Sequence, residues 1–495
     1  MRERDGLLRR TADLANDFLD GLSGRPVGRP VDLTSLRAGL GGPLPDGGGA
    51  PLAVIEELAA AADPGLVASA GPRYFGFVVG GGVPAALAAD WLTSAWDQNA
   101  GLYALSPAAA VVEEVAAGWL IDLFGLPEGS GVGFTTGATM ANFTAVAAAR
   151  HAVLRRVGWD VEVDGLTEAP PITVVVGDEA HVTIFASLQM LGLGRGRVHR
   201  VAADEQGRMR PDALRQTLAE VAGSDGNEAP LIVCAQAGNV NTGAFDPLPE
   251  IVEAVREHPG GWLHIDGAFG LWAAASASLS HRTNGVGDAD SWTTDAHKWL
   301  NVPYDSGIVI VRDAAAHRAA MTLGAAYYVE TSGGERDDYN WVPESSRRAR
   351  GFAVYAALRS LGRNGLAELI ERCCRIAGRM SATLAEADGV TILNDVVLNQ
   401  VLVRFAAPDG GDDDAFTRSV IAAVQTDGTC WLGGTTWRGQ AAMRISVSNW
   451  QTTERDADLS TGAILRCLAA VREGAAVPAD RQVVAPPEAA PTRSR

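Results

Sequence analysis

The chain has 495 residues, 47% of them hydrophobic, and a net charge of −18 from 41 basic and 59 acidic side chains. This size allows large buried cores, and the length suggests two to four domains. The acidic balance argues against nucleic acid and anionic membranes as partners, because both are bound by clustered cations. The composition is typical of an enzyme or binding protein that acts on small molecules.

The five cysteines are scattered along the chain and form no CxxC pair, so nothing indicates a metal site or a redox centre. We therefore expect reduced thiols, no bound metal and a reducing compartment. No apolar run reaches membrane-spanning length, and residues 1–10 are charged, with no apolar signal core after them. These features predict a cytoplasmic protein.

The first third of the chain predicts helices. An amphipathic pattern predicts one over residues 1–22, and another is expected over residues 52–61 after a linker rich in Gly and Pro. Long apolar stretches between residues 84 and 124 predict two more helices, separated around residues 97–107.

From about residue 132, short runs of β-branched residues alternate with helical segments. This alternation predicts a mostly parallel sheet covered on both faces by helices, an α/β fold. The predicted strands are residues 172–176, 197–201, 231–235, 262–265 and 308–311, and the helices are residues 139–157, 184–191, 212–221 and 249–257.

The last third predicts a smaller α+β domain. A long helix is expected from residue 347 to about 379, followed by strands at residues 400–405 and 443–447 and helices at residues 414–426 and 453–473. We therefore predict an N-terminal helical segment, a large domain, a small C-terminal domain and an Ala- and Pro-rich disordered tail, over residues 1–80, 81–345, 346–474 and 475–495.

Lys298 is the only lysine among the 41 basic residues. A guanidinium stays protonated at ordinary pH, whereas an ε-amine can lose its proton and condense with a carbonyl. The lysine is therefore a candidate for amine chemistry, although composition alone also allows an ordinary surface or ion-pair lysine.

Four motifs follow predicted strands, where open α/β sheets place ligands. The first motif, Phe134–Asn142, enters a helix, and a helix N-terminus favours a phosphate. Its Gly-Ala-Thr sequence is also an ordinary helix cap. His181 could stack on a flat ring or be structural. Asp266 could pair with a protonated ring nitrogen or cap a helix. The motifs are Phe134–Asn142, Val176–His181, Leu263–Phe269 and Ser291–Trp299.

An aspartate and a lysine about thirty residues apart, both near strand ends, form the arrangement that pyridoxal phosphate requires. The lysine forms an imine with this cofactor. The carboxylate keeps the pyridinium protonated, so that the ring acts as an electron sink.

Several segments resemble the group II pyridoxal-phosphate-dependent decarboxylases, such as the aromatic amino acid and glutamate decarboxylases. The resemblance covers roughly residues 50 to 470. It implies a type I aminotransferase fold, with a mostly parallel, seven-stranded type of sheet in the large domain, and normally an intertwined homodimer with active sites at the interface. The segments are Pro72–Phe77, Ser106–Pro107, His264–Ala268, Asp295–Leu300, Val302–Gly307, Ser345–Arg350 and Met443–Ser446.

The resemblance also implies roles for single residues. Lys298 would hold the internal aldimine and Asp266 the pyridine nitrogen, while His181 and Ala268 would lie on the two faces of the ring. A loop tyrosine, Tyr328 or its neighbour Tyr327, would protonate the quinonoid intermediate. The remaining cofactor contacts would be Gly137, Ala138, Thr139 and His297 at the phosphate and Asn239 at the phenolic oxygen.

Four further residues are candidates for contacting the substrate: Phe75, Asn99, Gly101 and Arg444. Asn99 and Gly101 stand where aromatic amino acid decarboxylases carry bulky apolar residues, which suggests a larger or more polar pocket. Arg444 could bind an α-carboxylate, as in aminotransferases, or form a structural ion pair.

The expected activity is decarboxylation of an L-amino acid to the amine. Decarboxylation with oxidative deamination to an aldehyde is an alternative, but in the family it accompanies a phenylalanine in place of the loop tyrosine. A carbon–carbon lyase, a transaminase and a catalytically silent cofactor-binding or scaffolding protein are also open. The sequence does not identify the amino acid.

Overall fold

The structure is a computed structural model that describes residues 2–28, 31–221, 229–322 and 335–474. These residues form two compact units. The large unit holds the described residues of Gly80–Ala377 and Asn394–Gln400, and the small unit those of Met1–Val79, Gly378–Leu393 and Val401–Pro487. The four-part division stays a prediction, and its tail lies outside the described residues.

The large unit is built on a seven-stranded sheet in the order β1-β7-β6-β5-β4-β2-β3. Strand β7 is antiparallel to β1 and β6, and the other pairs are parallel. The carboxyl ends of β1 to β6 therefore share one edge. The strands are β1 (Gly131–Thr135), β2 (Thr173–Gly177), β3 (His199–Val201), β4 (Leu231–Gln236), β5 (Trp262–Asp266), β6 (Ser291–Asp295) and β7 (Gly307–Val311).

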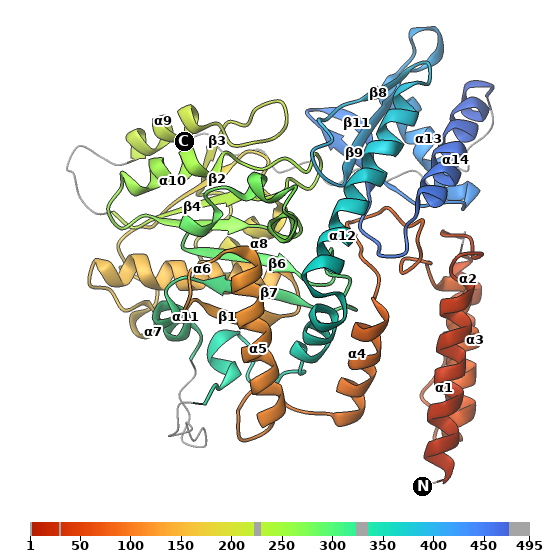
Figure 1. The fold of residues 1–495 in the computed structure, drawn as a ribbon, viewed down its shortest axis with the longest axis horizontal. Coiled ribbons are helices and arrows are strands. Elements are labelled where there is room, and N and C mark those ends of the chain that lie inside the picture. The colour runs from red at the N-terminus through yellow and green to blue at the C-terminus, as the bar shows by residue number, and fades with distance from the viewer. Residues whose placement is uncertain (1, 29–30, 222–228, 323–334, 475–495) are drawn as a thin grey trace. The chain divides into compact units, whose positions relative to one another are not determined.

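Helices cover both faces of this sheet (Figure 1), which confirms the predicted α/β architecture. Alternate strand residues such as Val174 and Val176 pack into one apolar cluster with the helices of one face, as expected for a period of two residues. That face carries α6 (Ala138–Arg156), α8 (Val182–Met190) and α11 (Ala314–Met321), and the other carries α9 (Pro211–Val221) and α10 (Leu248–Arg256).

Further helices of the large unit are α4 (Pro84–Trp96), α5 (Pro107–Phe124) and the short α7 (Val161–Asp164). The long helix α12 (Gly351–Ala385) is kinked at Gly362, where φ is 59°. Within the described residues, no helix is both long and apolar enough to cross a membrane.

The small unit contains a four-stranded sheet in the order β10-β11-β9-β8, with α13 packed on β11 and α14 packed on α13. This confirms the predicted smaller α+β part. Its elements are α1 (Arg2–Gly21), α2 (Leu33–Leu40), α3 (Pro51–Ala62), β8 (Val390–Ile392), β9 (Gln400–Phe405), α13 (Asp413–Asp427), β10 (Gly433–Trp437), β11 (Gln440–Ser446) and α14 (Glu454–Arg472).

Candidate active site

Lys298 lies in a tightly held turn after β6. Trp299 and Leu300 are fully buried, and the backbone N–H of His297 donates to the carbonyl of Ser306 at 3.2 Å. Gly80 lies so close that a Cβ there would be 1.8 Å from the carbonyl oxygen of Lys298. The backbone is thus fixed on both sides, while the lysine side chain is 18% exposed.

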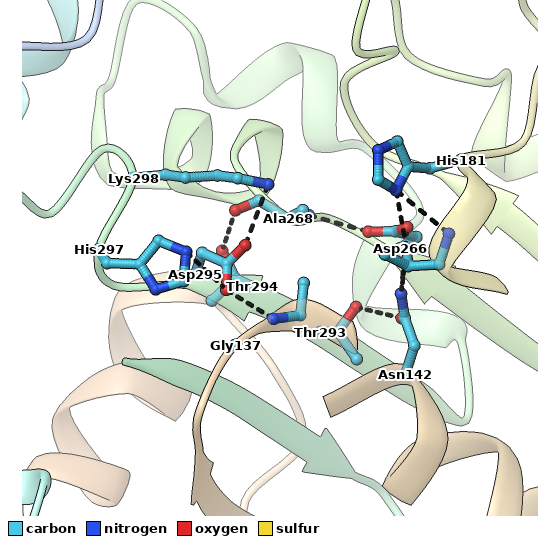
Figure 2. Close-up of polar contacts among 12 residues, drawn as sticks. Gly137, Asn142, His181, Asp266, Ala268, Thr293, Thr294, Asp295, His297 and Lys298 are labelled. Atoms are coloured by element: carbon cyan, nitrogen blue, oxygen red, sulfur yellow. Dashed lines mark hydrogen bonds and ion pairs between the residues drawn. The ribbon is translucent and has the colours of Figure 1, made fainter. Parts of the chain in front are cut away.

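The amine of Lys298 pairs with Asp295, the last residue of β6. Nζ lies 3.0 Å from Oδ2 of Asp295, and Oδ1 accepts the backbone N–H of Ala138 at 2.6 Å (Figure 2). No role for Asp295 was expected from the sequence. Its position three residues before the only lysine of the chain is the signal that could have identified it.

His297 lies on the other side of the same carboxylate. Burial lowers the pKa of its imidazole, so the ring is neutral at pH 7. Its Nδ1 accepts the backbone N–H of Ser306 at 3.1 Å, which leaves the ring proton on Nε2. That nitrogen lies 3.6 Å from Oδ1 of Asp295, and Tyr304 stacks on the ring at a centroid distance of 4.2 Å.

Asp266 ends β5, the strand next to β6, and is 6% exposed. Its Oδ1 accepts the N–H of Ala268 at 3.1 Å and its Oδ2 accepts the amide of Asn142 at 3.3 Å. Both of these donors, the Ala268 N–H and the Asn142 amide, are uncharged. A buried carboxylate of this kind favours a cationic partner, so Asp266 fits the protonated pyridine nitrogen of the predicted cofactor.

Asn142, for which no role was expected from the sequence, fixes the orientation of Asp266. Its Oδ1 accepts the hydroxyl of Thr293 at 2.7 Å and Nε2–H of His264 at 2.9 Å. Burial lowers the pKa of His264 to about 4, so this ring is neutral. The two amide hydrogens of Asn142 then point to Asp266 and to Thr183 Oγ1, at 3.3 and 3.1 Å.

The same network reaches His181, the N-cap of α8. Because Thr183 Oγ1 accepts from Asn142, its own hydrogen points to His181 Nδ1, 2.8 Å away. The backbone N–H of Thr183 points to the same nitrogen at 3.4 Å. Because Nδ1 accepts these hydrogen bonds, the ring proton lies on Nε2. Asp266 and His181 are thus linked through Asn142 and Thr183. Figure 2 shows Asp266, Asn142 and His181 in this network.

The predicted phosphate contacts lie at the start of α6. Gly137 is the N-cap, Ala138 is buried, and Thr139 is exposed. The loop packs against Gly307, where a Cβ would lie 2.4 Å from the Gly137 Cα. Closely packed glycines in front of a helix N-terminus leave backbone N–H groups accessible to an anion, and this fits the phosphate of the predicted cofactor.

Three of the predicted residues make their contacts inside the large unit: Asn239, Asn99 and Gly101. Asn239 is fully buried, and its Oδ1 accepts the N–H groups of Asn241 and Thr242. Asn99 Oδ1 accepts the N–H groups of Gly101 and Arg347 at 3.0 and 3.3 Å.

A Cβ at Gly101 would lie 2.0 Å from the Ser345 carbonyl. These contacts explain Asn99 and Gly101 without any effect on a pocket. The substrate role of both residues and the cofactor contact of Asn239 stay predictions.

The remaining predicted residues lie outside the large unit or outside the described chain. Phe75 belongs to the small unit, where it is 1% exposed and its backbone bonds to Trp431 and Ser446. Arg444 lies on β11 of the same unit, and burial lowers the pKa of its guanidinium. Tyr327 and Tyr328 lie outside the described residues.

A buried histidine of the large unit predicts sensitivity to acid. Burial lowers the pKa of His317 to about 4, whereas an unfolded histidine titrates near 6.5. The unfolded state therefore binds the extra proton first as the pH falls. Between pH 7 and 5 this titration alone should remove roughly 2 kcal/mol from the free energy of unfolding.

Denaturant titrations of the wild type and of His317→Gln at both pH values test this expectation. The variant keeps a donor for the carbonyl of Trp341, which His317 Nε2 contacts at 2.9 Å. It should lose less stability than the wild type on acidification. Equal losses would contradict the assignment.

The chain is similar to known proteins over most of its length. The family model of the pyridoxal-dependent decarboxylase conserved domain matches residues 36–406. The chain is 26% identical to an aromatic-L-amino-acid decarboxylase of Bacillus atrophaeus, covering 90% of this chain and 91% of that protein. It is 31% identical to an L-2,4-diaminobutyrate decarboxylase of Rhizobium meliloti (strain 1021), covering 74% and 72%.

Solved structures share the fold. The crystal structure of Oryza sativa TDC with PLP and tryptamine superposes with a TM-score of 0.88 at 22% identity, covering 95% of this chain and 99% of that one. Rhodiola rosea 4-hydroxyphenylacetaldehyde synthase gives 0.84 at 22% identity, covering 95% and 99%. These matches confirm the type I aminotransferase fold. The chain belongs to the pyridoxal-dependent decarboxylases, as a carboxy-lyase of group II whose cofactor is pyridoxal phosphate.

Proposed function

We propose that this enzyme converts an L-amino acid to the corresponding amine and CO₂ at the site of Lys298, Asp266 and His181. The observation that carries the proposal is the placement of the lysine and of Asp266 at the carboxyl ends of the neighbouring parallel strands β5 and β6. The amine, the buried carboxylate and the α6 N-terminus surround one region of the sheet edge (Figure 2).

The bound cofactor supplies a cationic ring that takes up the electron pair released when the carboxylate leaves. Lys298 binds the cofactor carbonyl carbon covalently, and Asp266 holds the proton on the ring nitrogen. Ala268 and His181 would hold the ring between them, and Nε2–H of His181 would be the donor for the substrate carboxylate. The four phosphate contacts are Gly137, Ala138, Thr139 and His297.

Release of CO₂ tests this function directly. The cofactor-loaded enzyme is incubated with aromatic, acidic and basic L-amino acids and L-2,4-diaminobutyrate, and CO₂, amine and ammonia are measured together. CO₂ with an equal amount of amine is the expected result. Equal amounts of CO₂ and ammonia would favour the aldehyde branch, and no CO₂ from any substrate would contradict decarboxylation of this panel.

We propose Tyr328 as the group that returns a proton to the substrate carbon. Its replacement by phenylalanine should divert product from amine to aldehyde in air. A carbanion that is not protonated can be oxidised by dissolved O₂ instead, and hydrolysis of the resulting imine gives the aldehyde and ammonia. The amine-to-ammonia ratio measures the change, with Tyr327→Phe as the matched control. An unchanged ratio in Tyr328→Phe and a shifted ratio in the control would transfer the role to Tyr327.

We also propose that the enzyme is a homodimer with shared active sites. In the small unit, Leu52, Val54 and Leu58 on α3 are 42–53% exposed. In the large unit, Trp91 and Trp96 on α4 are 42% and 48% exposed. Exposed apolar side chains grouped on one helix are typical of protein interfaces. Light scattering during gel filtration should give twice the chain mass of 51.6 kDa.

A further inference from the structure

The carboxylate of Asp295 lies at the centre of the groups that we assign to the cofactor. Its Oδ1 accepts the N–H of Ala138 at 2.6 Å, and its Oδ2 lies 3.0 Å from Nζ of Lys298. His297 Nε2, which carries the ring proton, is 3.6 Å from Oδ1. Two of these three groups are proposed phosphate contacts, and the third is the amine that binds the cofactor carbonyl.

The Asp295 carboxylate is held in this position by its strand. The side chain is 3% exposed, and its backbone N–H donates to the carbonyl of Ala268 at 2.9 Å. Asp295 also pairs in register with Gly307, the glycine that packs against Gly137. Only rotation of the side chain could move the carboxylate away from the α6 N-terminus.

A phosphate at this helix N-terminus therefore meets a carboxylate already bound there. The N–H of Ala138 cannot donate a short bond to both anions, and two like charges a few ångströms apart repel strongly away from water. An asparagine would accept the same N–H without the charge. The aspartate thus opposes the anion that the site must bind.

We propose that Asp295 is an internal anion that occupies the phosphate donors when the cofactor is absent and competes with the cofactor phosphate for them. The proposal rests on the proposed placement of the phosphate at Gly137, Ala138 and His297. Asp295 is then a positioning residue that keeps Lys298 and the α6 N-terminus together without cofactor, at the expense of cofactor affinity.

The test compares binding of pyridoxal phosphate and of pyridoxal, which lacks the phosphate. Full-length wild-type and Asp295→Asn proteins are freed of cofactor and titrated with each compound while the absorbance of the bound form is recorded. The variant should bind pyridoxal phosphate roughly tenfold more tightly or better, and its Kd for pyridoxal should change by less than about threefold. Inorganic phosphate should also inhibit cofactor binding at lower concentration in the variant.

Two further variants control for charge and for folding. Asp313→Asn removes an exposed carboxylate, and asparagine keeps the helix cap that Asp313 gives to α11. Its Kd for pyridoxal phosphate should stay within about twofold of the wild type, as expected for a remote screened charge. Asp295→Ser, smaller and neutral, should shift the Kd in the same direction as Asp295→Asn.

Weaker or unchanged binding of pyridoxal phosphate by both neutral variants would overturn the proposal and assign a purely structural role to Asp295. Equal tightening for pyridoxal phosphate and pyridoxal would also overturn it, because the effect would then act through Lys298 alone. If the cofactor does not modify Lys298 in the wild-type protein, the proposed cofactor site itself is overturned as well. Normal labelling of Lys298 with an unchanged Kd in the variants would overturn only the role of Asp295.

Discussion

Replacing Lys298 by arginine should abolish CO₂ release, with a loss of roughly a thousandfold or more, because a guanidinium cannot bind the cofactor carbonyl. Arginine keeps the positive charge beside Asp295, which lies 3.0 Å from the lysine Nζ. The variant should therefore fold and leave the carboxylate paired. Loss of activity with an unchanged circular dichroism spectrum would separate amine chemistry from charge.

The composition of the chain makes the covalent link directly visible. Lys298 carries the only ε-amine in the 495 residues. Reducing the cofactor-loaded enzyme with borohydride should make the link permanent and add the cofactor mass to one lysine peptide. The Lys298→Arg variant, treated in the same way, should show no modified side chain. Full turnover by this variant, or a cofactor label elsewhere, would contradict the proposed mechanism.

The sequence predicted the order of helices and strands in the large unit, but it did not identify β1 and β6 as strands. Both are fully buried. Strand β1 contains glycines that lower strand propensity, and the structure explains them, since a Cβ at Gly133 would lie 2.3 Å from the carbonyl of Trp341. Strand β6 is polar in sequence, because Thr293 and Asp295 bond to the site beside it.

His181 and Asp266 were predictable because each follows a predicted strand, and Lys298 because it is the only lysine in the chain. The residues that hold these side chains in place were not predictable. Asn142 lies within α6 and Thr183 within α8, and neither is near Asp266 in sequence. Only the packing of both helices on the same sheet face brings the Asn142 amide to within 3.3 Å of Asp266 Oδ2. Sequence periodicity places such a residue on a buried face but does not name its partner.

Replacing Asp266 by asparagine should weaken cofactor binding and lower kcat/KM by roughly a hundredfold or more, because the ring nitrogen loses its buried ionic partner. The hydrogen bonds that Asp266 accepts further raise the free-energy cost of this substitution. Asp266 accepts from Ala268 N–H and from the Asn142 amide, at 3.1 and 3.3 Å. An asparagine presents one acceptor and one donor there, so one N–H would face another donor.

Asp246 provides a matched control, because it is also a buried aspartate beside the sheet, 4% exposed. Its oxygens accept the N–H groups of Met209 and Gln236, both at 2.8 Å. Asp246→Asn should lower stability for the same donor-against-donor reason, but kcat at saturating cofactor should change by less than about threefold. Equal losses of kcat in the two variants would mean that Asp266 acts through folding alone. A selective loss in Asp266→Asn, together with a changed absorbance of the bound cofactor, would place the ring nitrogen at this carboxylate.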